Sequence, residues 1–300
     1  MPATPSVVVV GDALIDELRD AHGVREHVGG AGLNVAVGLA RLGVPATLVA
    51  MLGDDPAGGR IAEHLADAGV RLIPTTGPHG SSRAVSTRNA AGEPRYEFNL
   101  AARRRAIRFS PELTAAFAEA SFVVVSCFPF DDTAQSAALA AALSAAGTPL
   151  AVDPNPRTHL LADRDEFVRG FETLAARSAL VKLGDDDAEL LYGAPLVAVA
   201  ARLHRAGAGA VLATMGAGGA AVHSARGIVA RPVPSLPGAI VDTMGAGDAI
   251  LAATVASLVA DTGPGADADT GDWAKRLDAA MLVAAATCRH EGALLRRPDD

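Results

Sequence analysis

Val7-Val8-Val9-Val10 runs directly into Gly11, and this short stretch decides the fold class. β-branched residues favour extended backbone, and four apolar residues in succession indicate a strand that is buried on both faces. Strands of that kind occur where helices cover both sides of a mostly parallel sheet. The stretch therefore predicts an α/β fold, provided that helices alternate with further strands along the chain.

The rest of the chain alternates in that way. Further strands are expected at residues 46–52, 122–126, 149–152, 179–183 and 210–214. Helical periodicity is found at residues 31–42, 57–68, 131–146, 195–206 and 249–260. This pattern favours a mostly parallel central sheet with helices on both faces.

Two polar stretches interrupt the alternation. Residues 14–28 are short and strand-like around a turn at His22-Gly23, and residues 84–98 form a predicted hairpin around Asn89-Ala90-Ala91-Gly92. Both are too polar for a buried sheet. We therefore expect one α/β domain over residues 1–300, with lid segments at about residues 14–28 and 84–105 inserted in it.

Composition excludes several classes of protein. The 300 residues are 50% hydrophobic, which excludes intrinsic disorder, and 26 basic against 34 acidic residues give a net charge of −8. An acidic chain has no overall field for gathering nucleic acid or anionic membrane, and no apolar run reaches the roughly 18 residues of a membrane span. The two cysteines form no CxxC pair, as expected for reduced thiols in the cytoplasm.

The strongest local signal is Asp242-Thr243-Met244-Gly245-Ala246-Gly247-Asp248, followed by a helical run. Small residues before a helix let backbone N–H groups approach an anion, and the helix dipole adds partial positive charge there. Asp248 is expected in the first helical turn, ionised and with a low pKa, where it would suit a base for a hydroxyl that attacks a phosphoryl group. On spacing alone, a helix-capping Asp after a glycine-rich turn explains the pattern equally well.

This heptapeptide resembles the D-T-x-G-A-G-D motif of the ribokinase-like (PfkB) carbohydrate kinase family. The segment from Gly29 to Ala36, with Asn34, is similar to the family's G-G-x-x-x-N-x-A motif. Three more segments resemble family elements in the same order: Leu52-Gly53-Asp54-Asp55, Asp153-Pro154-Asn155-Pro156-Arg157 and Thr214-Met215-Gly216-Ala217-Gly218-Gly219. Together they cover most of the chain and imply an ATP-dependent sugar kinase with a ribokinase-like fold.

The resemblance also implies roles for individual residues. Asp248 would be the catalytic base, and the N–H groups of Gly245, Ala246 and Gly247 would form the anion hole. Residues implied to bind the sugar are Asp16, Asn34, Arg157 and the hinge pair Gly29 and Gly30. Residues implied to bind the nucleotide are Thr214, Gly216 and Gly219, together with Gly245 and Gly247. Without the resemblance, Asp16 would pass for a solvated turn residue and Asn34 for a helix cap.

Metal binding departs from the family pattern. The family often has Asn at position 184 and Glu at position 187, in an element linked to magnesium and phosphate. Here these are Gly184 and Asp187, so Mg²⁺ would be held largely by ATP phosphates and water, with Asp187 acting indirectly. By resemblance, the Asp242 region would hold a monovalent cation such as K⁺.

The D-P-N-x-R element favours a fructokinase. Alternatives are a 2-keto-3-deoxygluconate kinase, a ribokinase or a nucleoside kinase; Arg157 would either pair with a substrate anion or tie down its own loop. A non-catalytic sugar- or nucleotide-binding protein of the same fold is an alternative of another class, suggested by Gly184 and opposed by Asp248. A nicotinamide-dependent oxidoreductase is excluded because no G-x-G-x-x-G follows the first strand. An exposed strand edge in the lid allows a homodimer.

Overall fold

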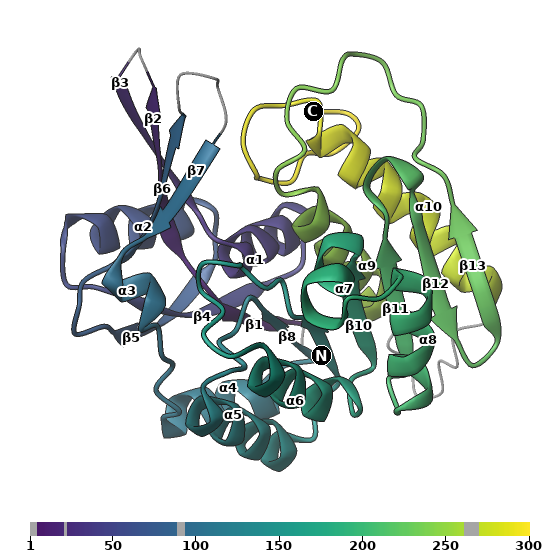
Figure 1. Ribbon diagram of the computed structural model, residues 1–300, viewed down its shortest axis with the longest axis horizontal. Coiled ribbons are helices and arrows are strands. Elements are labelled where there is room, and N and C mark those ends of the chain that lie inside the picture. The colour runs from purple at the N-terminus through teal and green to yellow at the C-terminus, as the bar shows by residue number, and fades with distance from the viewer. Residues whose placement is uncertain (1–4, 21–22, 89–93, 261–269) are drawn as a thin grey trace.

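Strand β1 (Val7–Gly11) is an interior strand, third from one edge, of a nine-stranded sheet in the computed structural model, which describes residues 5–20, 23–88, 94–260 and 270–300 (Figure 1). The spatial order is β13 (Gly227–Arg231), β12 (Ala220–Ser224), β11 (Ala210–Thr214), β10 (Leu180–Gly184), β9 (Leu150–Asp153), β8 (Phe122–Ser126), β1, β4 (Ala46–Leu52) and β5 (Arg71–Thr76). Neighbouring strands pair in parallel from β5 to β11, and β12 and β13 add in antiparallel fashion. The prediction of a mostly parallel central sheet is confirmed.

Helices cover both faces of this sheet, as predicted. One face packs on α1 (Ala31–Arg41), α2 (Pro56–Asp67), α9 (Ala246–Ala260) and α10 (Thr270–Thr287). The other face packs on α4 (Pro111–Glu119), α5 (Thr133–Ala146), α6 (Arg164–Ala175), α7 (Asp185–Tyr192) and α8 (Leu196–Arg205). Within β1, Val7 and Val9 enter the first cluster, whereas Val8 and Val10 enter the second. The continuous apolar run therefore contributes side chains to the hydrophobic clusters on both faces of the sheet.

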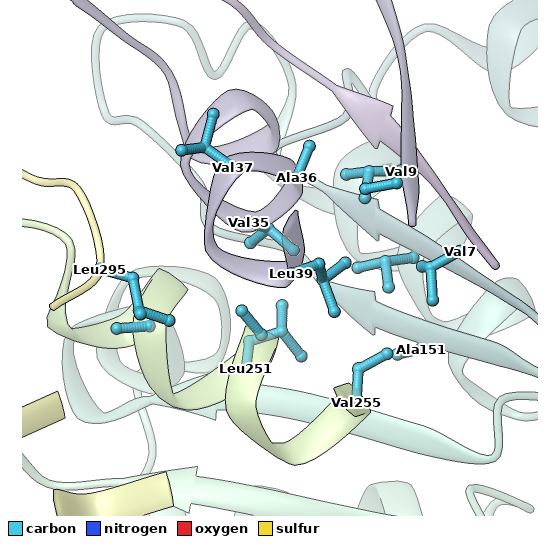
Figure 2. Packing of buried hydrophobic residues seen from close by; sticks show 14 of the residues in the cluster. Val7, Val9, Val35, Ala36, Val37, Leu39, Ala151, Leu251, Val255 and Leu295 are labelled. Atoms are coloured by element: carbon cyan, nitrogen blue, oxygen red, sulfur yellow. The ribbon is translucent and has the colours of Figure 1, made fainter. Parts of the chain in front are cut away.

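Helices α1 and α9 cross closely on the first face. Figure 2 shows side chains of α1, including Leu39, and of α9, including Leu251, gathered in one cluster with Val7 of β1. The crossing point is at Gly38, because a Cβ atom there would lie 3.1 Å from the Cβ of Ala252. Small residues at this contact let the two helices approach each other closely.

A second sheet of four strands projects from the main body (Figure 1). Its order is β3 (Gly23–Gly29), β2 (Leu14–Asp20), β6 (Ser82–Arg88) and β7 (Pro94–Phe98), and the short α3 (Leu100–Arg103) follows β7. Arg83 of β6 binds Glu26 of β3 at 2.5 Å and Glu17 of β2 at 3.3 Å, which ties the strands together. We call this sheet the lid sheet.

The lid sheet differs in detail from the sequence pattern. Strand β6 begins at Ser82, and residues 100–103 are helical. The predicted turn at residues 89–92, and His22 of the other turn, lie outside the described residues. None of the helices in the described part of the chain is long and apolar enough to cross a bilayer.

Candidate active site

At the carboxyl ends of β1 and β8 the order in which the chain adds strands to the sheet reverses. The chain leaves β1 through α1 toward β4, and leaves β8 through α5 toward β9 on the other side. Open α/β sheets bind ligands in the crevice at such a point. A small cavity lies here, lined among others by Asp12 and Ala13 after β1, Cys127 and Phe128 after β8, and Arg105. The candidate site therefore lies at this edge.

Asp248 and Asn34 meet beside this edge. Asn34 Nδ2 donates to Asp248 Oδ2 over 2.8 Å, and the two residues are 6% and 7% exposed. The contact follows from the helix crossing, because Gly38 and Ala252 each lie one turn further along their helices. In the described part of the chain, Asn34 Oδ1 is buried without a hydrogen-bond partner, so it remains an acceptor for a ligand.

The first turn of α9 offers backbone donors next to Asp248. Gly245 has φ +77°, and a Cβ atom there would lie 2.0 Å from the carbonyl oxygen of Ala293, so only glycine fits. The first N–H groups of a helix lack intrahelical partners and carry the positive end of its dipole. The N–H of Ala246 makes a long bond of 3.3 Å to Thr243 O, which leaves Gly245 and Gly247 as the better-placed donors.

The expected low pKa of Asp248 is wrong for this structure. Burial raises the pKa of Asp248 to about 7, and Asp153 adds to this effect, whereas the hydrogen bond from Asn34 and the charges of Lys182 and Arg157 oppose it. The result is a carboxylate whose pKa lies close to neutral pH, which suits a general base.

Asp16 faces the end of β3. A Cβ atom on Gly29 would lie 2.4 Å from Asp16 Oδ2, so the absence of a side chain at Gly29 makes room for this carboxylate. Burial raises the pKa of Asp16 to about 6, with a further contribution from Asp12 and opposition from Arg157. Asp16 is therefore a half-buried strand residue rather than a solvated turn residue. Gly30, with φ +113°, is the N-cap residue of α1 and turns the chain from the lid sheet into that helix.

Arg157 lies at the solvent-exposed side of the same region. Crowding by protein atoms disfavours its charge, but Asp12 and Asp248 together with other groups raise its pKa above the ordinary value. Asn155, two residues earlier, has a left-handed φ of +37°, a conformation that is unusual for a residue other than glycine. No ion pair within 4 Å engages Arg157 in the parts of the chain that the structure describes.

A buried ion pair lies close to Gly247 and influences Asp248, and the two residues that form it, Lys182 and Asp153, were not among the predicted site residues. Lys182 Nζ lies 3.1 Å from Asp153 Oδ2 and 3.8 Å from Asp187 Oδ2. Burial raises the pKa of Asp153 to about 6, against the effect of Lys182. The signal in the sequence was a lysine within an otherwise apolar strand, where unpaired charges are almost never found.

The nucleotide-side residues lie at the next strands of this edge. Thr214 ends β11 and pairs in register with Gly184, which ends β10. Asp187 Oδ2 accepts a hydrogen bond from the N–H of Gly184 at 2.7 Å and so caps α7. Gly216 and Gly219 have φ of +50° and +90° in the turn that leads to β12. Lys182 thus lies beside Asp187, the residue predicted for magnesium, and beside Gly247 of the predicted anion hole.

Asp242 holds its own loop. Its carboxylate accepts N–H bonds from Met244 at 2.9 Å and from Gly292 at 3.3 Å. The N–H of Val241 donates to Cys288 O at 2.9 Å and fastens the same loop to the end of α10. Each carboxylate oxygen of Asp242 keeps a second lone pair, so the group remains able to contact a cation.

Comparison with known proteins identifies the family. The model for the "pfkB family carbohydrate kinase" matches residues 4–300. The chain belongs to this family. A fructokinase from Klebsiella pneumoniae is 30% identical over 261 residues, which are 84% of each chain.

Solved structures agree with the family's fold. A fructokinase from Xylella fastidiosa with bound ATP superimposes with a TM-score of 0.82 at 24% identity, covering 97% of this chain and 94% of that chain. Aminoimidazole riboside kinase from Salmonella enterica, in complex with aminoimidazole riboside and an ATP analog, gives 0.77 at 25% identity and covers 98% and 97%.

This pfkB carbohydrate kinase is therefore a sugar phosphotransferase with a fructokinase-like sequence. A pfkB kinase needs a group to receive the proton of the attacking hydroxyl and donors to receive the charge of the transferred phosphoryl group. Asp248 is a carboxylate in the first turn of α9, where backbone N–H groups are also available, and Asn34 binds this carboxylate.

Proposed function

We propose that this kinase transfers the γ-phosphoryl group of ATP to a hydroxyl of fructose, with Asp248 as the base. The observation that carries the proposal is the 2.8 Å hydrogen bond between Asn34 and Asp248 at the N-terminus of α9. This hydrogen bond brings together the segment that contains Asn34 and the segment that ends at Asp248, the two segments that resemble family motifs most clearly. The fructokinase relative from Klebsiella pneumoniae supports the choice of sugar.

Each residue of the proposed site has a separate task. Asp248 takes the proton from the sugar hydroxyl, and the oxygen then attacks the γ-phosphorus while the bond to ADP breaks. Asp16 and the free Oδ1 of Asn34 orient sugar hydroxyls, and Gly29 and Gly30 let the lid sheet move against α1. The transition state is loose, so orientation and charge stabilisation contribute more than the strength of the base.

The anion hole and the nucleotide residues act on the other substrate. Backbone N–H groups of the first turn of α9 stabilise charge on the transferred phosphoryl group. Residues assigned to the anion hole are Gly245, Ala246 and Gly247, and those assigned to the nucleotide are Thr214, Gly216 and Gly219, with Gly245 and Gly247 shared.

Magnesium fits the chain in an indirect role. Among the described residues, no three His, Cys, Asp or Glu side chains converge to hold a metal ion. Mg²⁺ commonly binds through substrate phosphates and water with one or two carboxylates nearby, and Asp187 is such a carboxylate. When bound, Mg²⁺ neutralises charge on the phosphates. Asp242 would face a K⁺ ion through its remaining lone pairs.

A sugar acid is the alternative substrate that a specific observation favours. Arg157 stands at the site without a close carboxylate partner in the described chain, so its guanidinium is available to a substrate carboxylate, as a 2-keto-3-deoxygluconate kinase would need. Ribokinase and nucleoside kinase activities remain further alternatives, since the Salmonella enterica structure is of a riboside kinase.

The test is ADP release across a panel of fructose, ribose, 2-keto-3-deoxygluconate and a nucleoside, with Asp248→Asn as the control. Fructose should give the highest kcat/KM, and the variant should lose about 10²–10⁴ in kcat. A preference for the sugar acid, abolished by Arg157→Leu, would replace fructose by the alternative. Undiminished turnover in Asp248→Asn would remove that residue from the mechanism.

We further propose that the protein is cytoplasmic and forms a homodimer through the lid sheet. Cys127 and Cys288 are both free thiols, which supports a reducing compartment. Strands β3 and β7 are the edges of the lid sheet, and Val24 on β3 is 60% exposed. Light scattering should give the mass of a dimer, and Val24→Glu should lower it to that of a monomer; a monomeric wild type at micromolar concentration excludes the dimer.

A further inference from the structure

Lys182 is a charged residue in the interior of the main sheet. It lies on β10, whose other residues before Gly184 are apolar, and its side chain is 8% exposed. Asp153, its partner at 3.1 Å, has a fully buried side chain. Asp153 Oδ1 has no hydrogen-bond partner among the described residues, so Lys182 is the main compensation for this buried charge.

The ammonium group reaches the first turn of α9. A Cβ atom on Gly247 would lie 3.2 Å from Lys182 Nζ and 3.5 Å from Cε. Glycine at position 247 therefore makes room for the lysine. Burial disfavours the charge of Lys182, but Asp153, Asp187 and Asp248 raise its pKa above the ordinary value, so it carries a positive charge at neutral pH.

We propose that Lys182 is a catalytic residue whose ammonium group completes the anion hole and binds the phosphoryl group during its transfer. The inference rests on the phosphoryl transfer proposed above. In that step the sugar oxygen forms its bond to the γ-phosphorus and the hydroxyl proton goes to Asp248. The bond from the γ-phosphorus to the bridging oxygen breaks, and its electron pair leaves with ADP. Lys182 exchanges no proton and forms no covalent bond.

The charge around the site supports this role. Lys182 and Arg157 are the basic groups that influence Asp248. The acidic groups that face this region are Asp12, Asp16, Asp153, Asp187 and Asp248. A triphosphate adds further negative charge, and a cation that is already fixed in a dry site stabilises it without reorganisation. Gly184 has no side chain that could bind the phosphates, so their binding depends more strongly on Lys182.

A purely structural role for Lys182 makes different predictions. If the lysine served only to neutralise Asp153, removing both charges together would restore stability and activity alike. The decisive variants are Lys182→Met and the double variant Lys182→Met with Asp153→Asn. Lys275→Met is the matched control, because Lys275 is the other lysine of the chain and is exposed.

The expected results separate the two roles. Lys182→Met should lower the melting temperature and reduce kcat by about 10²–10³, the usual effect of losing one donor to a transition-state oxyanion. The double variant should recover the melting temperature but keep the loss in kcat, with KM for the sugar within about twofold of wild type. Recovery of kcat in the double variant would overturn the proposal. No turnover by the wild type on any sugar would instead count against the proposed function.

A measurement on the unmodified sequence covers the case in which neither variant folds. Protein labelled with ¹³C at lysine Cε gives signals from two residues only. With sugar present, a non-hydrolysable ATP analogue should shift the Lys182 signal more than ADP does, because the terminal phosphoryl group is the expected contact. Lys275 should not respond. Equal shifts with the analogue and with ADP would contradict the assignment.

Discussion

Asn34 donates a hydrogen bond to Asp248 across 214 positions of sequence, at 2.8 Å. The two residues belong to helices that cross one turn further along, where Gly38 faces Ala252. The geometry of the candidate base is therefore set by packing in the hydrophobic core. Activity and core packing should respond together to a change at the crossing.

Gly38→Val tests this coupling. The new Cβ atom would lie 3.1 Å from Ala252 Cβ and 3.2 Å from Leu295 Cδ1, so α1 and α9 must move apart. Such overpacking costs about 1–3 kcal/mol of folding free energy, and kcat should fall because Asn34 no longer orients Asp248. Gly59→Val is the control, since a Cβ atom there meets no other element of the described chain within 4 Å. A destabilised Gly38→Val with full kcat would show that the site does not depend on the crossing.

The pH dependence of kcat/KM should reveal the carboxylate of Asp248. Its pKa of about 7 in the free protein means that the base is protonated at lower pH, so activity should rise with pH through this value. The groups that face it are Asn34, Asp153, Lys182 and Arg157. Rate measurements from pH 5 to 9 check the prediction, and a profile that is flat across neutral pH would contradict it.

The same carboxylate should reduce stability at high pH. Because the folded-state pKa of about 7 exceeds the ordinary value of 3.8 for an aspartate side chain, the folded protein binds the proton more tightly than the unfolded chain. The contribution of Asp248 to the free energy of unfolding therefore falls as pH rises from about 4 to about 7. Asp248→Asn should therefore melt higher than wild type at pH 8, and the difference should shrink toward pH 5. A variant that melts below wild type at pH 8 would contradict the prediction, because the ionised Asp248 would then stabilise the fold.

Much of the main sheet followed from local pattern. The run Val7–Val10 had to be buried on both faces, and the predicted strands of the main sheet lie within one residue of the observed ones. Helix α6 was missed because it buries only a narrow stripe, with Phe167 and Phe171 in an otherwise polar sequence. Strands β5, β12 and β13 were missed: β5 and β13 are short and mostly exposed, and β12 is a five-residue strand that begins with two alanines, which have a low strand propensity.

The site was predictable in its residues but not in its electrostatics. The motifs indicated that Asp248 and Asn34 share one site, and the structure brings them into contact. The pKa of Asp248 depends on its burial and on charged and polar groups from several separate elements. The sequence does not show how far these groups lie from Asp248. For the same reason the ion pair between Lys182 and Asp153 could not be predicted, because it depends on the pairing of β9 with β10.

Gly29→Ala should impair sugar binding without damaging the fold. The new methyl group would lie 2.4 Å from Asp16 Oδ2, and apart from its chain neighbours it meets no other described residue within 4 Å, so this flexible carboxylate must rotate away. Loss of a charge-assisted hydrogen bond of about 1.5–3 kcal/mol should raise KM for the sugar about 10–100-fold and leave KM for ATP unchanged.

A double-mutant cycle checks the cause of that loss. In an Asp16→Ala background, Gly29→Ala should have no further effect on KM for the sugar, because the displaced group is already missing. Gly59→Ala serves as the neutral glycine replacement. Additive effects of the two substitutions would mean that Gly29 acts on the substrate by a route other than Asp16.

Gly184→Asn should strengthen the use of magnesium. Position 184 is the N-cap of α7 with φ −91° and ψ 166°, a conformation open to any residue, and Asn is a preferred N-cap that adds a few tenths of a kcal/mol over glycine. A Cβ atom there would lie 3.1 Å from Asp187 Oδ2 and 3.6 Å from Thr214 Oγ1, so the amide would stand between the residues assigned to Mg²⁺ and to the nucleotide. We expect a lower Mg²⁺ concentration for half-maximal activity and a slightly higher melting temperature. Gly184→Ala supplies the same Cβ without the amide, and equal Mg²⁺ titration curves for the two variants would show that the missing side chain is irrelevant to the metal.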